Sequence, residues 1–228
     1  NSALYGMYHT YDPQCKFPCQ SPMLDQKIYW LTKIAEQGDL DAPYELGLLY
    51  LTKSSLNGYQ TAFNIFLSLA EKGDAKAQER LGFMYEINAI GEDEKNDEKV
   101  LYWYTKAAEQ GHGKAAQKLG SAYHYGFNGV LKDEEKSYYW YKIGAEAGNL
   151  ESQRMYSFSF SCGPNDVQGC DQRIYWLTKC TEKGYYLCPD ALDRARQWAA
   201  AESNSLQDGL NAYDKGDFKK AIPILLPF

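Results

Sequence analysis

The sequence predicts an all-α protein, a right-handed α-solenoid of stacked antiparallel helix hairpins. The first observation is a glycine that recurs at intervals of 35 to 38 residues: Gly38, Gly73, Gly111, Gly148 and Gly184. The second is another small residue that follows nine residues later in most copies: Gly47, Gly82, Gly120 and Ser157. A repeat of this length is typical of a helical solenoid, in which each unit is one helix hairpin.

The chemistry of the repeat agrees with helix hairpins. A glycine after a helix adopts the left-handed conformation that ends it, and Asp39, Asp74 or Asn149 then follows to cap the next helix. The second glycine, as in Gly82 and Gly120, falls inside a helix, where it costs about 1 kcal/mol relative to alanine. Recurrence of that cost predicts a helix crossing with no room for a Cβ atom.

The elements follow in order along the chain. We expect residues 2–9 to be the second helix of a repeat whose first helix is missing, so the chain is expected to be a processed or trimmed form. The predicted hairpins are 25–37 with 41–52, 58–72 with 75–87, 98–110 with 114–125, and 134–147 with 150–160. A further first helix is predicted over 171–183, and a polar helix over 191–202 caps the array. The loop 90–97 is acidic and is predicted to be solvated. A calcium site is the alternative, although its carboxylates lack the spacing and order of an EF-hand loop.

The repeats resemble Sel1-like repeats, relatives of the tetratricopeptide hairpin. The motifs are Ala77-x-x-x-Leu81-Gly82-x-x-Tyr85, Ala116-x-x-Leu119-Gly120-x-x-Tyr123, Lys99-x-x-x-Trp103-x-x-x-Ala107-Ala108-x-x-Gly111 and the loop Tyr125-Gly126-x-x-Gly129-Val130-x-x-Asp133. The resemblance covers nearly the whole chain and is strongest over residues 27–160. It implies a Sel1-like solenoid over residues 1–202.

The six cysteines fall into three close pairs, Cys15–Cys19, Cys162–Cys170 and Cys180–Cys188. An even number in tight pairs indicates disulfides and a periplasmic or secreted protein. Zinc is the alternative, although the pairs lack the CxxC spacing and have no nearby histidine. For Cys15–Cys19, a rigid loop is favoured over a redox site. Cysteine-rich Sel1-like proteins use a spacing similar to that of the other two pairs to tie the helices of one hairpin.

The C-terminal segment 205–228 resembles the opening of a Sel1-like protein. We therefore expect it to pack ahead of residues 2–9. Within one chain, this arrangement implies that the numbering is not the native order. The alternative is a head-to-tail or swapped contact, in which the segment docks on a neighbouring molecule.

The composition limits the classes of molecule that the protein is expected to bind. The net charge is −6 and the pI about 5.2, without a basic run, so nucleic acid is not expected as a partner. No apolar run approaches the roughly 20 residues of a membrane span. Twenty tyrosines and five tryptophans indicate either repeated core packing or an adhesive binding face.

No catalytic motif is present. The chain has no Gly-x-Ser-x-Gly elbow, phosphate-binding loop or His-Glu-x-x-His. His9, His112 and His124 are scattered, so no base is evident for a nucleophile. We expect no catalytic residue, metal or cofactor. Some cysteine-rich relatives are linked to penicillin binding or hydrolysis, but this chain lacks the Ser-x-x-Lys motif of the usual serine enzymes.

Two rows of side chains on the second helices should form a ridge on the concave face. One row follows the second glycine of each repeat, and the other lies three residues before it. The predicted ridge comprises Met7, Tyr44, Leu48, Glu79, Phe83, Gln117, Ser121, Arg154 and Phe158. Its apolar and aromatic members suit contacts with a protein partner. The alternative is that these side chains touch the neighbouring repeat.

The resemblance implies a non-catalytic, protein-binding role in a bacterial periplasm. One use is an immunity protein that neutralises a toxic secreted lipase or similar effector. The other is an adaptor in cell-envelope complexes. An acidic, aromatic-rich solenoid suits occlusion of an active-site entrance, so the inhibitor is favoured.

Overall fold

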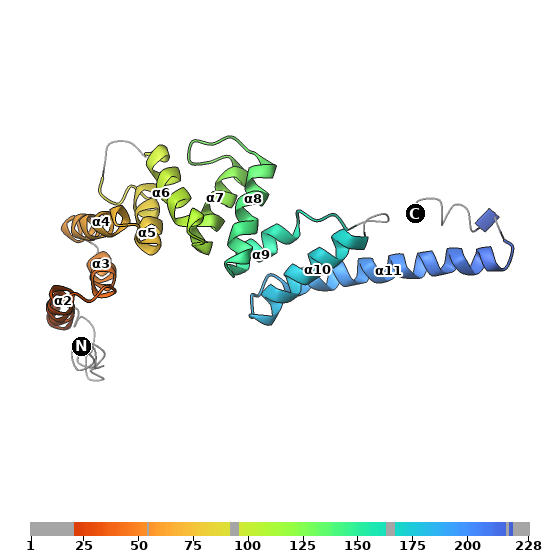
Figure 1. Cartoon of the computed structure of the whole chain (residues 1–228), viewed down its shortest axis with the longest axis horizontal. Helices are drawn as coiled ribbons and strands as arrows, with labels where there is room; N and C mark the ends of the chain where they lie inside the picture. Colours follow the sequence, from red (N-terminus) through yellow and green to blue (C-terminus); the bar gives the residue numbers. More distant parts are fainter. Residues whose placement is uncertain (1–20, 54, 92–95, 163–166, 218, 221–228) are drawn as a thin grey trace. The chain divides into compact units, whose positions relative to one another are not determined.

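The structure is a computed structural model that describes residues 21–53, 55–91, 96–162, 167–217 and 219–220 (Figure 1). Every regular element in these residues is an α-helix, which confirms the all-α prediction. The chain divides into two compact units, residues 1–110 and residues 111–228.

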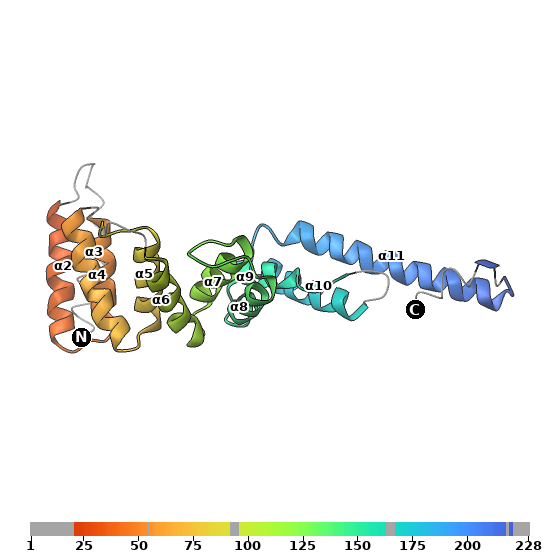
Figure 2. The same ribbon diagram turned by 90° about the horizontal axis from the view of Figure 1, so that it is seen from above.

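The first unit contains five helices within its described residues. They are α2 (Ser21–Glu36), α3 (Ala42–Thr52), α4 (Leu56–Glu71), α5 (Ala75–Glu86) and α6 (Asp97–Glu109). Each helix packs against the next one along the chain, and Figure 2 shows α2, α3 and α4 side by side. The predicted hairpins 25–37 with 41–52 and 58–72 with 75–87 are therefore present, with ends that differ by a few residues.

The second unit also contains five helices within its described residues. They are α7 (Gly113–Tyr125), α8 (Glu134–Glu146), α9 (Leu150–Ser157), α10 (Val167–Glu182) and α11 (Pro189–Asp214). Successive helices again pack on each other, and α10 and α11 lie side by side in both Figure 1 and Figure 2. The helix α11 is longer than the predicted 191–202, because it continues without a break through 203–205 to Asp214.

The recurring glycines end helices as the sequence predicts. All five have φ between 77° and 95°, in the left-handed region: Gly38, Gly73, Gly111, Gly148 and Gly184. A side chain is strained in this region, so glycine is the residue that ends the helix without a steric cost.

Side-chain caps begin the helices that follow. The Asp74 carboxylate accepts a hydrogen bond from the Ala77 amide at 2.7 Å, and the Asn149 side chain accepts one from the Ser152 amide at 2.8 Å. Asp39 accepts from two backbone amides at the start of α3. Each cap satisfies amides that have no partner within their helix.

The second glycine of three repeats lies where an aromatic ring of the next helix crosses it. A Cβ atom built on these glycines would lie 2.6–2.7 Å from a ring carbon, closer than atoms approach. The pairs are Gly47 with Phe66, Gly82 with Tyr104 and Gly120 with Tyr141. All three rings are buried. The missing side chain therefore lets the ring of the next repeat fill the crossing, as the repeated cost predicts.

The cores of the two units contain these crossings together with other buried side chains. In the first unit, the largest fully buried side chains include Phe66, Leu81, Met84 and Tyr104. Burial of each such side chain stabilises the fold by roughly 1.5–3 kcal/mol. In the second unit, a further core joins α10 and α11. Its buried members are Leu177, Cys180, Cys188, Ala191, Leu192 and Ala195.

Two of the three expected cysteine pairs lie in the described residues, and both are bonded. Cys180 of α10 is bonded to Cys188 at the start of α11, with Cα atoms 6.1 Å apart. This bond ties the two helices of one hairpin. Cys162, after α9, is bonded to Cys170 in α10. Cys15 and Cys19 lie outside the described residues.

The predicted contact between 205–228 and residues 2–9 is not tested. Residues 1–20, 218 and 221–228 lie outside the described part of the chain. Residues 205–214 form the last part of α11 rather than a separate helix. The contact stays a prediction.

Candidate functional site

In the first unit the predicted ridge is carried by α3 and α5. Tyr44, Leu48 and Phe83 are half-buried, so each keeps part of its side chain exposed. Glu79 is only 2% exposed, and one carboxylate oxygen lies 3.7 Å from Arg80 Nε. Glu79 is thus covered by the fold and does not belong to a surface that a partner could reach. Met7 lies outside the described residues.

Tyr44 contacts its neighbouring repeat. Its hydroxyl oxygen accepts a hydrogen bond from Arg80 Nε at 3.1 Å. Its ring centroid lies 5.6 Å from that of Phe66, and Lys76 Nζ lies 5.9 Å from the Tyr44 centroid. The side chain therefore joins α3 to α4 and α5 while one side stays exposed. For this residue, packing on a neighbour and a place on the ridge are compatible.

A buried tyrosine, Tyr104, holds α6 against α5, one of the helices that carry the ridge. The Tyr104 hydroxyl donates a hydrogen bond to a Glu86 carboxylate oxygen at 2.8 Å. Burial and the nearby charge of Glu86 both raise the pKa of Tyr104 far above its ordinary value. The phenol therefore stays neutral and donates. Because the same ring fills the crossing at Gly82, this bond fixes α6 against α5.

In the second unit the ridge begins with a polar chain on α7. Gln117 Nε2 donates to Ser121 Oγ at 2.9 Å, and Ser121 Oγ lies 3.1 Å from the Tyr141 hydroxyl. Burial raises the pKa of Tyr141 to about 12, and the hydrogen bond with Ser121 partly opposes that rise. Gln117 and Ser121 are half-buried and hydrogen-bonded within the chain, so the α7 part of the predicted ridge presents polar groups that already have partners.

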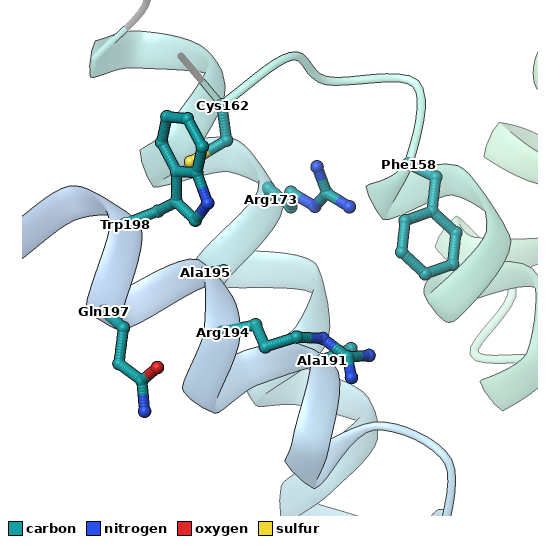
Figure 3. Close-up of a pocket in the computed structure, with 8 residues that line it drawn as sticks. All are labelled: Phe158, Cys162, Arg173, Ala191, Arg194, Ala195, Gln197 and Trp198. Carbon is teal, nitrogen blue, oxygen red and sulfur yellow. The ribbon is translucent and has the colours of Figure 1, made fainter. Parts of the chain in front are cut away.

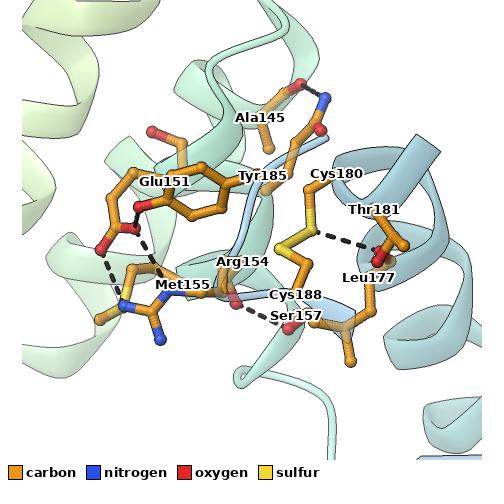
Figure 4. The surroundings of a disulfide bond; sticks show 12 residues. Ala145, Glu151, Arg154, Met155, Ser157, Leu177, Cys180, Thr181, Tyr185 and Cys188 are labelled. Carbon is orange, nitrogen blue, oxygen red and sulfur yellow. Dashed lines mark hydrogen bonds and ion pairs between the residues drawn. A yellow bond between two sulfur atoms is a disulfide. The ribbon is translucent and has the colours of Figure 1, made fainter. Parts of the chain in front are cut away.

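The α9 part of the ridge forms a charged cluster beside the Cys180–Cys188 disulfide (Figure 4). Arg154 donates to both carboxylate oxygens of Glu151, at 2.8 and 3.2 Å. The Tyr185 hydroxyl also donates to Glu151. Burial favours the neutral acid, but these hydrogen bonds hold the pKa of Glu151 below its ordinary value. The charge of Arg154 is thereby neutralised inside the protein.

A pocket opens next to Phe158 in the second unit (Figure 3). Its volume is about 340 Å³. It is lined by Phe158, Cys162, Arg173, Ala191, Arg194, Ala195, Gln197 and Trp198. Figure 3 shows the guanidinium groups of Arg173 and Arg194 directed toward Phe158, with the Trp198 indole beside Cys162. Three elements supply the walls: α9 with the segment after it, α10 and α11.

The electrostatics of this pocket are unusual for an acidic protein. Arg173 Cζ lies 4.9 Å from the Phe158 ring centroid. Burial and the like charge of Arg194 lower the pKa of Arg173. Among the described residues, no carboxylate lies within ion-pair distance of Arg173 or Arg194. The arrangement concentrates positive charge on an apolar floor, which suits an anionic group.

The sequence reasoning identified Phe158 but missed Arg173, Arg194 and Trp198. Arg173 lies on a first helix, and the other two lie on α11, which the sequence presented only as a polar cap. No spacing in the sequence brings these three side chains together, because they meet only when α11 folds back on α10.

A second set of exposed aromatic residues was also missed. In each of four first helices, a tyrosine precedes a tryptophan, and the two ring centroids lie 4.9–5.2 Å apart, edge to face. The tyrosines are 48–59% exposed. They are Tyr29 and Tyr102 in the first unit, and Tyr139 and Tyr175 in the second. The signal was available, since each lies nine residues before a closing glycine.

The described residues contain no group of three or more histidine, cysteine, aspartate or glutamate side chains that could hold a metal ion. His112 precedes α7, and His124 lies against the rings of Tyr125 and Tyr141. His9 lies outside the described part of the chain. Among the helices as described, none has the length and apolarity needed to cross a membrane.

Comparison with known proteins gives a family match and several solved structures with a similar fold. A family model described as Sel1 repeat matches residues 28–39, 75–112 and 113–149. A Sel1 repeat protein from Oxalobacter formigenes is 25% identical, with a TM-score of 0.56, over 76% of this chain and 74% of that one. A protective antigen of uropathogenic Escherichia coli with an SLR fold is 24% identical, with a TM-score of 0.54, over 85% of this chain and 53% of that one.

An immunity protein from Pseudomonas aeruginosa is also similar, at 20% identity over 79% of this chain and 80% of that one. Its TM-score is 0.38, so this likeness carries no argument about function. No curated protein matches the sequence significantly.

Proposed function

Because this chain is a Sel1-like repeat protein, a class that generally serves as a protein-interaction scaffold, we propose that it acts by binding another protein. The proposed role is that of an inhibitor or immunity protein. It would neutralise a secreted toxic effector, such as a lipase, by covering the entrance to the effector's active site.

The half-buried ridge is the observation that supports this proposal. Leu48 on α3 and Phe83 on α5 keep part of their apolar side chains exposed. In the second unit, Phe158, which directly follows α9, lines the pocket. Partly exposed aromatic and aliphatic side chains on rigid helices suit tight binding, because little conformational entropy is lost when they are covered.

The proposed compartment is the bacterial periplasm. Two disulfides in the described residues fit an oxidising environment, since the cytosol keeps thiols reduced. The Cys180 and Cys188 side chains are fully buried in the core between α10 and α11. The bond therefore forms part of the core that holds α10 against α11.

An adaptor for cell-envelope complexes is the second candidate. The observation that favours it is the set of exposed tyrosines on α2, α6, α8 and α10. These helices do not carry the ridge, so the chain offers aromatic groups on two different sets of helices. An adaptor needs more than one contact surface, whereas an inhibitor needs one.

The test is affinity capture from the periplasm of the source organism under non-reducing conditions. The bait is the intact protein, compared with a Leu48→Glu and Phe83→Glu double variant. We expect the native protein to retain one enzyme in equimolar amount and to inhibit it on mixing. We expect the double variant to lose both properties.

Leu131→Glu is the matched control, because Leu131 is 89% exposed and lies outside the ridge. Retention of several envelope proteins at low stoichiometry would favour the adaptor. Equal inhibition by the native protein and the double variant would reject the ridge as the binding surface.

A further inference from the structure

We propose that the pocket between α9, α10 and α11 binds a carboxylate side chain in an acidic segment of a partner protein. The carboxylate would lie between the guanidinium groups of Arg173 and Arg194 (Figure 3). Only the class of ligand rests on the proposed function; the pocket itself is defined by the residues around it.

The charges of the pocket carry this inference. Three arginines lie near Phe158, but they differ in their partners. Arg154 has both oxygens of Glu151 within 3.2 Å, so its charge is satisfied. No carboxylate of the described residues pairs with Arg173 or Arg194, and the two groups repel each other. A carboxylate placed between them would relieve that repulsion and accept charge-assisted hydrogen bonds from both.

The apolar part of the pocket favours a protein segment over a free anion. The Phe158 ring forms one wall, and the methyl groups of Ala191 and Ala195 form another. Trp198 is 52% exposed at the pocket. Because the two alanines are small, they leave room for a neighbouring aromatic or aliphatic side chain of the same segment. Aromatic residues exposed around a pocket are typical of protein-binding sites.

The volume of the pocket and the net charge of the protein restrict the class of ligand further. A volume of about 340 Å³ accommodates one or two side chains rather than a folded element. A net charge of −6 opposes a long polyanion such as nucleic acid. A short acidic segment with one apolar residue satisfies both limits, since only its carboxylate needs to meet positive charge.

The experiment uses the full-length oxidised protein and a short fluorescein-labelled peptide of glutamate and glycine around one phenylalanine. Binding is measured by fluorescence anisotropy at low and physiological salt. We expect saturable binding that weakens as salt increases. The same peptide with glutamine in place of glutamate should bind at least about tenfold more weakly, because the charge-assisted hydrogen bonds are lost.

Variants of single arginines locate the site. Arg173→Gln and Arg194→Gln should each weaken binding about tenfold. Arg196→Gln is the matched control, because Arg196 lies on the same helix and changes the net charge equally but does not line the pocket. Arg194 is exposed, so its replacement should leave the fold intact even if that of Arg173 does not.

Three outcomes would overturn the inference. Equal weakening by Arg194→Gln and Arg196→Gln would indicate a general charge effect. Equal binding of the glutamate and glutamine peptides would indicate an apolar groove without a carboxylate site. Binding of inorganic phosphate without binding of the peptide would indicate a free-anion site instead.

The outcome is separable from that of the proposed function. If a captured effector is inhibited equally by the native protein and the Arg194→Gln variant, the inhibitor role stands and the pocket inference fails for that partner. If the peptide binds in an arginine-dependent way but no effector is inhibited, the pocket stands and the inhibitor role fails.

Discussion

At the scale of single residues, the packing of neighbouring repeats depends on glycines that have no side chain as much as on the aromatic rings that pack against them. Gly82 and Gly120 provide flat surfaces for the rings of Tyr104 and Tyr141. The hydroxyl of each tyrosine is hydrogen-bonded within its own unit, to Glu86 or Ser121. A buried ring that is held at both ends has little freedom to move away from a new atom, so these crossings should tolerate substitution poorly.

Substitution of Gly120 by alanine tests this argument. The new Cβ atom would lie 2.6 Å from a carbon of the Tyr141 ring. Overpacking typically costs about 1–3 kcal/mol, whereas alanine gains about 1 kcal/mol over glycine in a helix. We expect a net loss of up to about 2 kcal/mol in the free energy of unfolding, measured by urea denaturation.

The control for Gly120→Ala is the same change in a Tyr141→Ala background. Truncation at Cβ removes all three ring carbons of Tyr141 that the new Gly120 Cβ atom would meet, so Gly120→Ala should there be neutral or stabilising. A Gly120→Ala protein as stable as the native one would show that the crossing has room to adjust.

The Glu151 carboxylate predicts a specific pH dependence. Its pKa in the folded protein lies below the ordinary value of 4.5, since Arg154 and Tyr185 donate to the charged form against the effect of burial. A lowered pKa stabilises the fold above the unfolded-state pKa, and this contribution is lost as the pH falls through the folded-state pKa. Glu151→Gln should therefore lose about 1 kcal/mol at neutral pH.

The difference between the native protein and Glu151→Gln should shrink as the pH falls below 4.5. Urea denaturation across this range measures it. Glu146→Gln, which changes an exposed carboxylate at the end of α8, provides the control. A stability difference that stays constant with pH would contradict the assignment of the effect to the charge of Glu151.

At the scale of helices, local signals were sufficient where a cap and a closing glycine were both present. The end of α4 at Gly73 and the start of α5 after Asp74 follow directly from such signals. The end of α11 did not, because the predicted helix 191–202 stops before Ser203, Asn204 and Ser205, whereas the observed helix includes them. Each residue of this type costs less than about 0.7 kcal/mol in a helix, so α11 continues through them, and through Gly209, to Asp214.

The ridge shows the limit of prediction by position within the repeat. Tyr44, Leu48 and Phe83 are partly exposed, as their positions in the repeat predict. The corresponding repeat position predicted that Glu79 is also exposed, but Glu79 is buried. Repeat position specifies the direction of the Cα–Cβ bond, whereas burial depends on neighbouring side chains such as Arg80. The Arg173 and Arg194 pocket was unpredictable for the same reason, since contacts between helices create it.

The two described disulfides offer a matched comparison between elements. Both join cysteines eight positions apart, so the restriction of the unfolded chain should be equal, about 2.5 kcal/mol each at 25 °C. Cys180 and Cys188 are also fully buried within the core between α10 and α11, whereas Cys162 is half-exposed. Replacement of Cys180 and Cys188 by alanine should therefore destabilise more than replacement of Cys162 and Cys170.

Urea denaturation of the two double-alanine variants measures this difference. The native protein after reduction provides the reference, because it lacks both bonds but keeps the sulfur atoms. A smaller loss for the Cys180 and Cys188 variant would show that the buried bond does not contribute to the packing of α10 on α11.

At the scale of the whole molecule, charge is distributed unevenly. The chain carries a net charge of −6, yet two arginines without a carboxylate partner among the described residues share one pocket in the second unit. The net negative charge of this protein repels other acidic proteins and so opposes non-specific association with them. The local positive charge of the pocket then favours a partner that places a carboxylate at that one position. Such a distribution is consistent with a protein that recognises a particular partner rather than acidic proteins in general.

The proposed contact between 205–228 and residues 2–9 makes a prediction for the intact molecule. Leu210, in the last part of α11, is 43% exposed and lies in this segment. If the segment docks on a neighbouring molecule, sedimentation should show concentration-dependent dimers, and Leu210→Asp should abolish them. If it packs within its own chain, the native protein should stay monomeric, and Leu210→Asp should cost about 1–3 kcal/mol of stability, because a charge would enter an apolar contact.

Leu131→Asp is the control for this comparison, because Leu131 is 89% exposed in the loop between α7 and α8. A monomeric protein in which the two aspartate variants are equally stable would contradict both forms of the contact. The segment 205–228 would then make no such contact with residues 2–9. A dimer sensitive to Leu210→Asp alone would mean that the segment 205–228 docks on a second molecule.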